Sequence, residues 1–397
     1  MKGGSYRIGG RDSHDGPTTH YDTPINRHRL LVLLQLAALL GLASLARPPV
    51  LLVRLGPQQQ VSTRMPIAGV HTRFSDEVEE WKVQRGLAMV REMGAAWVVE
   101  FFPWAYAEPA PGRYDWAAFD RIINHANRQG LTVIARLGFV PLWAREKAIG
   151  KVGAEQTTVT FLPPALYDDF ATFAAAFARH YAGQVKYFQV WNEPNLALEW
   201  GMQPVDPAGY VAMLQQVYPA IKAANPDSVV LGGALAPTLE PEGSAGGLND
   251  LVYLERIYTA LGGGPRPWDG LAIHAYGFDR PPGEAPAADR LNFRRVEQVR
   301  EIMRAHGDAG DVHITEAGWN DDPRWPRAVT PAKRIAYTLG AWDWASEHWV
   351  WVKSVSMWVF KLPAPARNYR DRFTFVTPSL EPLPIYEEIR KALVEER

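Results

Sequence analysis

The sequence contains no cysteine. This absence excludes disulfide bonds, thiolate metal sites and a catalytic cysteine, and it leaves the redox compartment undecided. The sequence also lacks a Gly-x-Gly-x-x-Gly turn after its first strand-like run, which weakens the case for a doubly wound, dinucleotide-binding sheet. What remains is the composition of a folded protein, with 47% hydrophobic and 21% charged residues.

The sequence also has no excess of positively or negatively charged residues. The 397 residues include 42 Lys and Arg against 43 Asp and Glu, without a block of like charges. A protein that binds nucleic acid needs concentrated positive charge to hold the phosphates. We therefore expect no nucleic acid partner. Tryptophan, in contrast, is abundant at 15 residues, and the flat indole face suits the C–H face of a sugar.

A nearly unbroken apolar run extends from Leu30 to Ala46 and follows a basic cluster. Its length is at the short limit for a segment that spans a membrane. We expect a disordered cytoplasmic tail at 1–29, a transmembrane signal anchor at 30–53, a linker at 54–65 and one folded domain at 66–397. On this interpretation the protein crosses the membrane once, and the folded domain is extracytoplasmic.

Two other interpretations of the apolar run stay open. The small residues of Ser44-Leu45-Ala46 have the spacing of a signal-peptidase site, so the segment is also compatible with a cleaved signal peptide. The run is also compatible with a buried core helix.

From Pro66 onward, short β-branched runs alternate with longer helical stretches. Several of the runs are continuously apolar, as parallel strands covered on both faces should be. Eight β/α units in this length predict a (β/α)₈ barrel, with an open doubly wound sheet as the alternative. The expected strands are 67–71, 97–102, 132–137, 185–191, 228–232, 270–274, 312–315 and 354–360.

Two glutamates stand at the ends of apolar, strand-like runs. Glu193 follows the run 185–190, and Glu316 follows the run 312–315. In a parallel barrel the carboxyl ends of all strands meet at one mouth, and two carboxylates at such a mouth are the minimum needed to cleave a glycosidic bond. The other polar or aromatic residues that close the expected strands belong to the same mouth: His71, Trp104, Arg136, His274, Tyr276 and Trp358.

With Asn192-Glu193-Pro194 after the fourth strand and Thr315-Glu316 after the seventh, the chain resembles the clan of retaining glycoside hydrolases built on (β/α)₈ barrels. Families 5 and 39 look most similar. The segments Phe102-Pro103-Trp104 and Pro141-Leu142-Trp143-Ala144 add to the resemblance, which covers about residues 66–390. It implies a hydrolase of O-glycosidic bonds in a β-linked oligo- or polysaccharide, with no metal or organic cofactor.

The resemblance also implies a role for several residues. Glu193 matches the general acid and base, and Glu316 matches the nucleophile. Asn192 matches the residue that binds the 2-hydroxyl of the sugar. His274 and Tyr276 match the pair that orients the nucleophile, and Trp358 matches the platform beneath the sugar.

The chain also departs from this pattern. Many members of the clan carry an arginine on the second strand near the nucleophile, and Glu100 occupies that region here. Arg136 on the third strand is expected to supply the missing charge or to pair with Glu100. His71 and Trp104 are expected to contact sugar.

Three alternatives accompany this prediction. A metal-dependent hydrolase would need a His-x-His pair on the first strand, but His71 has no second histidine beside it. A glycan-binding protein on a catalytically retired barrel would normally have lost one of the two glutamates. A transglycosylase would use the same covalent intermediate and differs only in the acceptor.

Overall fold

The computed structural model describes residues 27–45 and 55–394. The chain divides into two units, residues 1–53 and 54–397. We describe each on its own. Most of the expected tail, the second part of the expected anchor (46–53) and the first residue of the expected linker lie outside the described residues.

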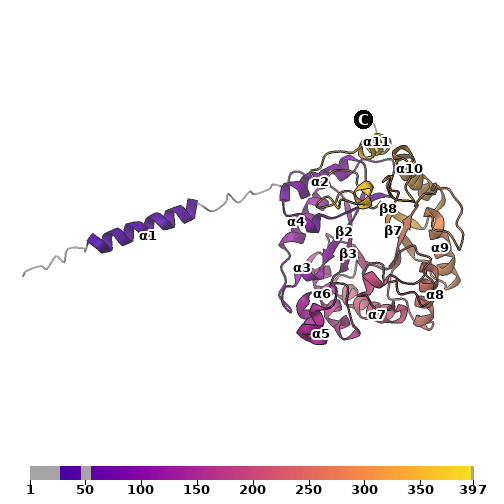
Figure 1. The fold of residues 1–397 in the computed structure, drawn as a ribbon, viewed down its shortest axis with the longest axis horizontal. Coiled ribbons are helices and arrows are strands. Elements are labelled where there is room, and N and C mark those ends of the chain that lie inside the picture. Colours follow the sequence, from indigo (N-terminus) through magenta and orange to yellow (C-terminus); the bar gives the residue numbers. More distant parts are fainter. Residues whose placement is uncertain (1–26, 46–54, 395–397) are drawn as a thin grey trace, which may run out of the picture. The chain divides into compact units, whose positions relative to one another are not determined.

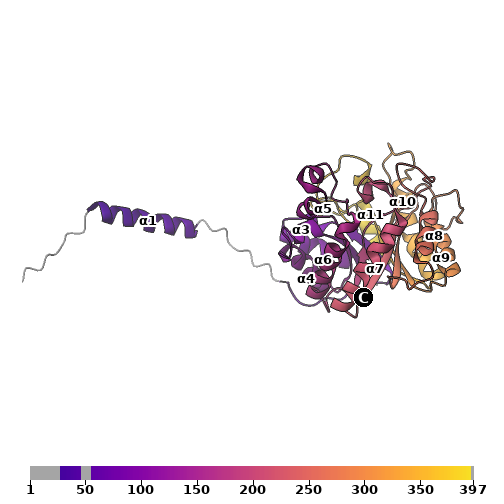
Figure 2. The same ribbon diagram turned by 90° about the horizontal axis from the view of Figure 1, so that it is seen from below.

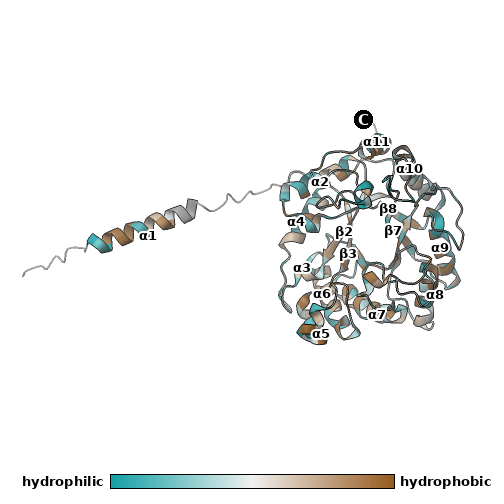
Figure 3. Cartoon of the chain, in the orientation of Figure 1, coloured by the Kyte–Doolittle hydropathy of each residue, from teal (hydrophilic) through white to brown (hydrophobic). Residues whose placement is uncertain are grey.

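The first unit contains helix α1 (Arg27–Leu45). Its first turn is hydrophilic and most of the helix beyond it is hydrophobic (Figure 3). From Leu30 to Leu45 the helix rises about 24 Å, which is shorter than the ~30 Å of a hydrocarbon core. Among the described residues, no helix combines the length and apolarity needed to cross a membrane, so the transmembrane segment expected at 30–53 is not supported.

The second unit is a closed barrel of eight parallel strands in sequential order, which confirms the predicted (β/α)₈ architecture (Figure 1). All eight expected strands form, with ends that differ from the predicted ones by a few residues. The strands are β1 (Ala68–Thr72), β2 (Trp97–Pro103), β3 (Thr132–Gly138), β4 (Tyr187–Val190), β5 (Val229–Leu235), β6 (Gly270–Tyr276), β7 (Asp311–Gly318) and β8 (Val352–Met357).

Helices flank the barrel on its outside (Figure 2). Their apolar faces pack on the strands and form the main hydrophobic core, while a smaller cluster fills the barrel interior. The helices are α2 (Glu80–Glu92), α3 (Trp104–Ala107), α4 (Ala117–Arg128), α5 (Leu142–Glu155), α6 (Tyr167–His180), α7 (Pro207–Ala224), α8 (Asp250–Leu261), α9 (Val296–Ala305), α10 (Pro331–His348) and α11 (Pro384–Leu393).

Part of the expected linker packs on the barrel. The backbone N–H of Gln59 donates to the carbonyl of Arg128 at the end of α4, and that of Arg64 donates to Leu393 at the end of α11, both at 2.8 Å. These bonds attach the segment 59–64 to the end of the barrel at which the helices finish.

An extra residue in β7 changes which side chains point inward. Ala272 of β6 pairs with His313, Ile273 pairs with Ile314, and His274 then pairs with Glu316. Thr315 is left over as a β-bulge. Side chains alternate between the two faces of a strand, so without the bulge Glu316 would point outward. With the bulge, its side chain points into the barrel, as that of His274 does.

Candidate active site

Glu193 lies one turn beyond the end of β4, on backbone that an ordinary residue rarely adopts. Trp191 and Glu193 have φ values of 72° and 40°, in the left-handed region that disfavours a Cβ atom. Hydrogen bonds hold this turn: Glu193 N–H donates to Ala234 O at 2.9 Å, and Trp191 N–H donates to Leu137 O at 3.0 Å. The turn thereby presents the Glu193 carboxyl at the mouth of the barrel.

The two glutamates face each other across His274. The nearest side-chain oxygens of Glu193 and Glu316 and a ring nitrogen of His274 all lie within 4.8 Å of one another. His274 Nδ1 is 2.7 Å from Glu193 Oε1 and 3.7 Å from Glu316 Oε2. The structure therefore brings together the two carboxylates that the sequence places at separate strand ends.

Glu316 is buried, yet four neighbours favour its charged form. Tyr276 Oη donates to Glu316 Oε2 at 2.7 Å, and Arg136 Nη1 donates to Glu316 Oε1 at 3.1 Å. Burial alone would raise the pKa of Glu316, but His274, Arg136 and this tyrosine, together with His71, lower it to about 2. Glu316 is thus an ionised carboxylate at neutral pH.

Arg136, rather than a residue of the second strand, supplies the positive charge beside Glu316. Glu100 lies apart from it and accepts hydrogen bonds from Thr72 Oγ1 and from the backbone N–H groups of Phe74 and Ser75. Its role is to hold the turn after β1. The expected alternative, an ion pair between Arg136 and Glu100, does not form.

His71 and His274 have opposite protonation preferences. Burial lowers the pKa of His71 to about 3, so its Nε2, 3.4 Å from Arg136 Nη1, acts as an acceptor. Burial also disfavours the charged form of His274, but the charge of Glu316 and the hydrogen bond with Glu193 outweigh it and raise its pKa. His71 therefore orients Arg136. It also lines the cleft described next, so its expected contact with sugar stays a prediction.

A cleft of about 360 Å³ opens above these residues. Asn192 and Trp358, both expected to contact sugar, line it. The sequence reasoning missed several other lining residues because they lie on loops, which have no periodic signal. These residues are Arg73, Leu198, Glu199, Phe278, Trp325, Tyr369, Arg370 and Phe373.

The aromatic side of the cleft joins two of these loops. Trp325, after β7, stacks on Tyr369, after β8, with ring centroids 5.6 Å apart. Asn320 Nδ2 donates to the backbone carbonyl of Tyr369 at 2.6 Å. Phe373 makes T-shaped ring contacts with both Tyr276 and Trp358. Flat rings in this arrangement offer apolar faces to a sugar.

Trp104 is not part of the cleft. It is fully buried in α3 and packs against Trp143, Phe170 and Phe173. Its indole N–H donates to the carboxylate of Glu108. The residue closes the second strand as expected, but the helix that begins there turns its ring away from the mouth.

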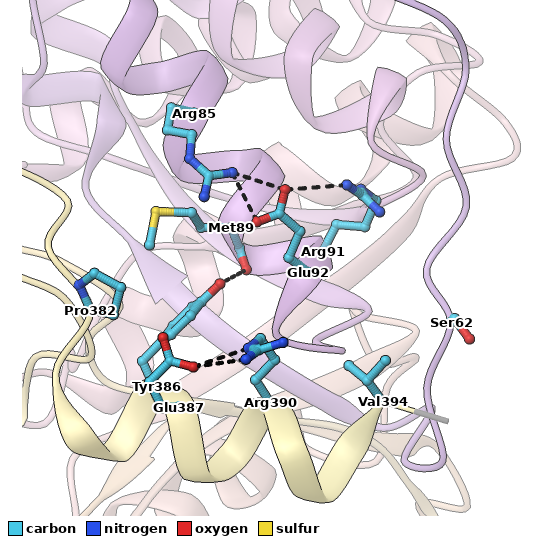
Figure 4. Close-up of a pocket in the computed structure, with 10 residues that line it drawn as sticks. All are labelled: Ser62, Arg85, Met89, Arg91, Glu92, Pro382, Tyr386, Glu387, Arg390 and Val394. Atoms are coloured by element: carbon cyan, nitrogen blue, oxygen red, sulfur yellow. Dashed lines mark hydrogen bonds and ion pairs between the residues drawn. The ribbon is translucent and has the colours of Figure 1, made fainter. Parts of the chain in front are cut away.

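A separate hollow of about 510 Å³ lies between α2 and α11, at the opposite end of the barrel (Figure 4). Its charged side chains already have partners. Arg85 Nη1 donates to both oxygens of Glu92 at 2.8 Å, and Arg390 pairs with Glu387 at 3.0 Å. Tyr386 Oη donates to Met89 O. This hollow therefore offers no convergent polar groups comparable to those of the cleft.

Glu193, His274 and Glu316 are also close enough to hold a metal ion, as a group found among the described residues. Arg136 contacts Glu316 Oε1 at 3.1 Å, so a cation bound there would face the guanidinium at short range. This charge makes the site a poor fit for a metal.

Comparison with known proteins supports the resemblance given by the sequence motifs. Residues 74–148 match a protein family described as beta-galactosidase. No curated protein sequence matches the chain. Among solved structures, a family 39 glycoside hydrolase from Bacteroides cellulosilyticus WH2 is similar, with a TM-score of 0.62 and 19% identity over 82% of this chain. This chain spans only 63% of that protein's length.

Two further structures show the same relationship. A family 39 β-xylosidase from Caulobacter crescentus has 19% identity and a TM-score of 0.56, covering 85% of this chain and 72% of its own. Xylanase 10B from Thermotoga maritima has 15% identity and a TM-score of 0.57, covering 83% of this chain and 95% of its own. At these identities the likeness establishes the fold, which is that of (β/α)₈ glycoside hydrolases.

Proposed function

We propose that this protein is a retaining glycosidase that hydrolyses β-linked glycans, with Glu316 as nucleophile and Glu193 as general acid and base. The observation that carries the proposal is the approach of one oxygen of each carboxyl group to within 4.8 Å of the other, with Glu316 held ionised. Retaining enzymes have carboxyl groups about 5–5.5 Å apart, and inverting enzymes about 6.5–9.5 Å. So close an approach of the nearest oxygens supports the retaining class.

In the first step, Glu316 attacks the anomeric carbon while Glu193 gives its proton to the leaving oxygen. The glycosidic bond breaks, and a glycosyl ester of Glu316 forms. His274 Nδ1, 2.7 Å from Glu193 Oε1, holds the acid in place for this transfer. Arg136 and Tyr276 fix the oxygens of Glu316 so that the nucleophile needs little reorganisation.

In the second step, Glu193 has lost its proton and acts as the base. It takes a proton from water, whose oxygen attacks the anomeric carbon and releases Glu316 as a carboxylate. Two inversions give net retention. A sugar hydroxyl in place of water would give transglycosylation through the same intermediate.

The test is turnover of a panel of β-glycans and aryl β-glycosides by the full-length chain and two variants. We expect Glu316→Gln to reduce turnover by at least about 10⁴-fold, because an amide is not a nucleophile. Glu301→Gln, an exposed glutamate of α9, is the matched control and should keep wild-type activity. Wild-type turnover that persists in Glu316→Gln would exclude this nucleophile.

The role of Glu193 has its own test. Glu193→Ala should still cleave aryl glycosides with good leaving groups in the first step, since these need no acid. Azide should then accelerate the second step and produce a β-glycosyl azide. No rescue, together with equal losses on good and poor leaving groups, would remove Glu193 from this role. Binding of glycans without turnover would favour a retired barrel.

The location of the enzyme is a separate proposal. We infer that the barrel acts outside the cytoplasm, because the apolar run Leu30–Ala46 follows a basic cluster and precedes the folded domain. Protease treatment of intact and permeabilised cells measures the location. Sequencing of the N-terminus of the isolated protein distinguishes cleavage after Ala46 from retention of the segment as an anchor. Protection of the barrel until the cytoplasmic membrane is opened would contradict the proposal.

A further inference from the structure

A third carboxyl group in the cleft has no part in the two-glutamate reaction. Glu199 belongs to the short helix η3 (Ala197–Trp200) and lines the cleft. Its backbone is fixed on both sides. Trp191 Nε1 donates to the Glu199 carbonyl at 2.8 Å, and Thr160 Oγ1 donates to the neighbouring Leu198 carbonyl at 2.8 Å. Glutamate side chains are rarely buried without a partner, so the position of Glu199 in the cleft calls for an explanation.

The neighbours of Glu199 come from three other parts of the barrel. Asn192, after β4, is within hydrogen-bonding reach of its carboxyl group. Arg136 from β3 attracts it, and Glu193 and Glu316 repel it. Burial is the largest influence and, with the two glutamates, raises the pKa of Glu199.

The side-chain oxygen of Asn192 is buried and available to a ligand. Its Oδ1 has no hydrogen-bond partner within the described residues. A carboxylate only accepts hydrogen bonds, so the Asn192 amide must turn its NH₂ group toward Glu199. This orientation leaves Oδ1 as an acceptor for a hydroxyl donated by the substrate, which would satisfy an otherwise costly buried group.

We propose that Glu199 is a positioning residue that orients Asn192 toward a substrate hydroxyl. The proposal rests on the proposed glycosidase activity. It implies a sugar with a free hydroxyl beside the anomeric carbon.

Two substitutions test this role. Glutamine keeps an oxygen that accepts from Asn192, whereas alanine removes it. We expect Glu199→Gln to keep most of the wild-type kcat/KM at the pH optimum and Glu199→Ala to lower it about ten- to a hundredfold.

The positioning role is measured with a double-mutant cycle. If Glu199 acts through Asn192, then Asn192→Ala and the double variant Glu199→Ala/Asn192→Ala should have nearly equal kcat/KM at the pH optimum. The Glu199→Ala loss should also shrink on a 2-deoxyglycoside. Thermal unfolding of every variant checks the fold, and Glu301→Gln again serves as control.

The outcomes distinguish this inference from the proposed function. No turnover by the wild type contradicts the glycosidase itself. Losses that simply multiply in the double variant contradict the positioning role. A non-additive cycle, with the Glu199→Ala loss reduced on the 2-deoxyglycoside, supports it.

Discussion

At the scale of single residues, only a few hydrogen bonds to Glu316 keep its carboxyl group ionised. Two hydrogen bonds, from Tyr276 and Arg136, reach its two oxygens from different strands. Each oxygen has one such donor, so the loss of either leaves a buried carboxylate oxygen without its partner.

We predict that Tyr276→Phe raises the pKa of Glu316 from about 2. The proposed mechanism needs ionised Glu316, so activity should be present above this pKa and be lost as the pH falls through it. A raised pKa therefore moves the acidic limb of kcat/KM to higher pH, by about one unit. We also expect kcat to fall about a hundredfold.

The matched control is Tyr218→Phe, which removes a similar hydroxyl-to-carboxylate bond, to Asp269, away from the cleft. It should leave both limbs of the profile in place. An acidic limb that is the same in Tyr276→Phe and the wild type would show that the hydroxyl does not support the charge of Glu316.

Residues inside strand-end motifs were accessible to sequence reasoning. Glu193, Glu316 and Tyr276 follow apolar runs, and their convergence follows from the parallel barrel. Glu199 and Trp325 were not accessible, because loop residues reach the cleft through turns that hydrophobic periodicity does not encode. Trp104 shows the opposite error: its place in a strand-end motif suggested the cleft, but α3 turns it into the core.

At the scale of elements, the bulge in β7 decides whether the Glu316 side chain points into the barrel. Ile273 and Ile314 face the helices, whereas Ala272 belongs to the barrel interior. Strict alternation would have pointed Thr315 inward and Glu316 outward. The existence of the strand was predictable from its β-branched residues, but the bulge was not, because one extra residue leaves no mark on so short a run.

The bulge buries a hydroxyl group without a hydrogen-bond partner in the described part of the chain, and the resulting loss of stability can be measured by mutation. Thr315 is fully buried and its hydroxyl has no partner within the described residues. We predict that Thr315→Val raises the free energy of unfolding by about 1 kcal/mol, since a methyl group needs no hydrogen bond. Urea denaturation measures it. Thr374→Val, which removes a hydroxyl that donates to Asp371 O, should lower stability by a similar amount. Equal effects of the two variants would contradict the argument.

At the scale of the whole molecule, two buried histidines link stability to pH. Burial lowers the pKa of both His71 and His313 to about 3, whereas the unfolded chain binds protons near pH 6.5. Between these values the unfolded state holds more protons. The free energy of unfolding therefore falls as the pH drops from about 6.5 towards 3, by up to about 1.4 kcal/mol per pH unit for each histidine.

We predict that His313→Gln makes this dependence shallower. His313 lies far from the cleft, between Trp97 and Tyr187 at the other end of the barrel interior, and donates to or accepts from Ser354 Oγ at 2.9 Å. The readout is the slope of unfolding free energy against pH from 6.5 to 4.5, whatever the change in absolute stability. His348→Gln, on the exposed end of α10, should keep the wild-type slope. An unchanged slope in His313→Gln would contradict the linkage.

The contact between the two aromatic loops has a consequence for how such an enzyme acquires new substrates. The carboxylates come from strand ends, whereas Trp325 and Tyr369 come from loops that can vary without disturbing them. These loops are nevertheless interdependent, because Asn320 donates to Tyr369 O and the two rings stack. A change in one loop removes the partner of the Asn320–Tyr369 hydrogen bond or of the stacked ring in the other loop. The two loops should therefore change together when sugar preference changes. A graft of one loop alone should lose more affinity for the glycan than a graft of both.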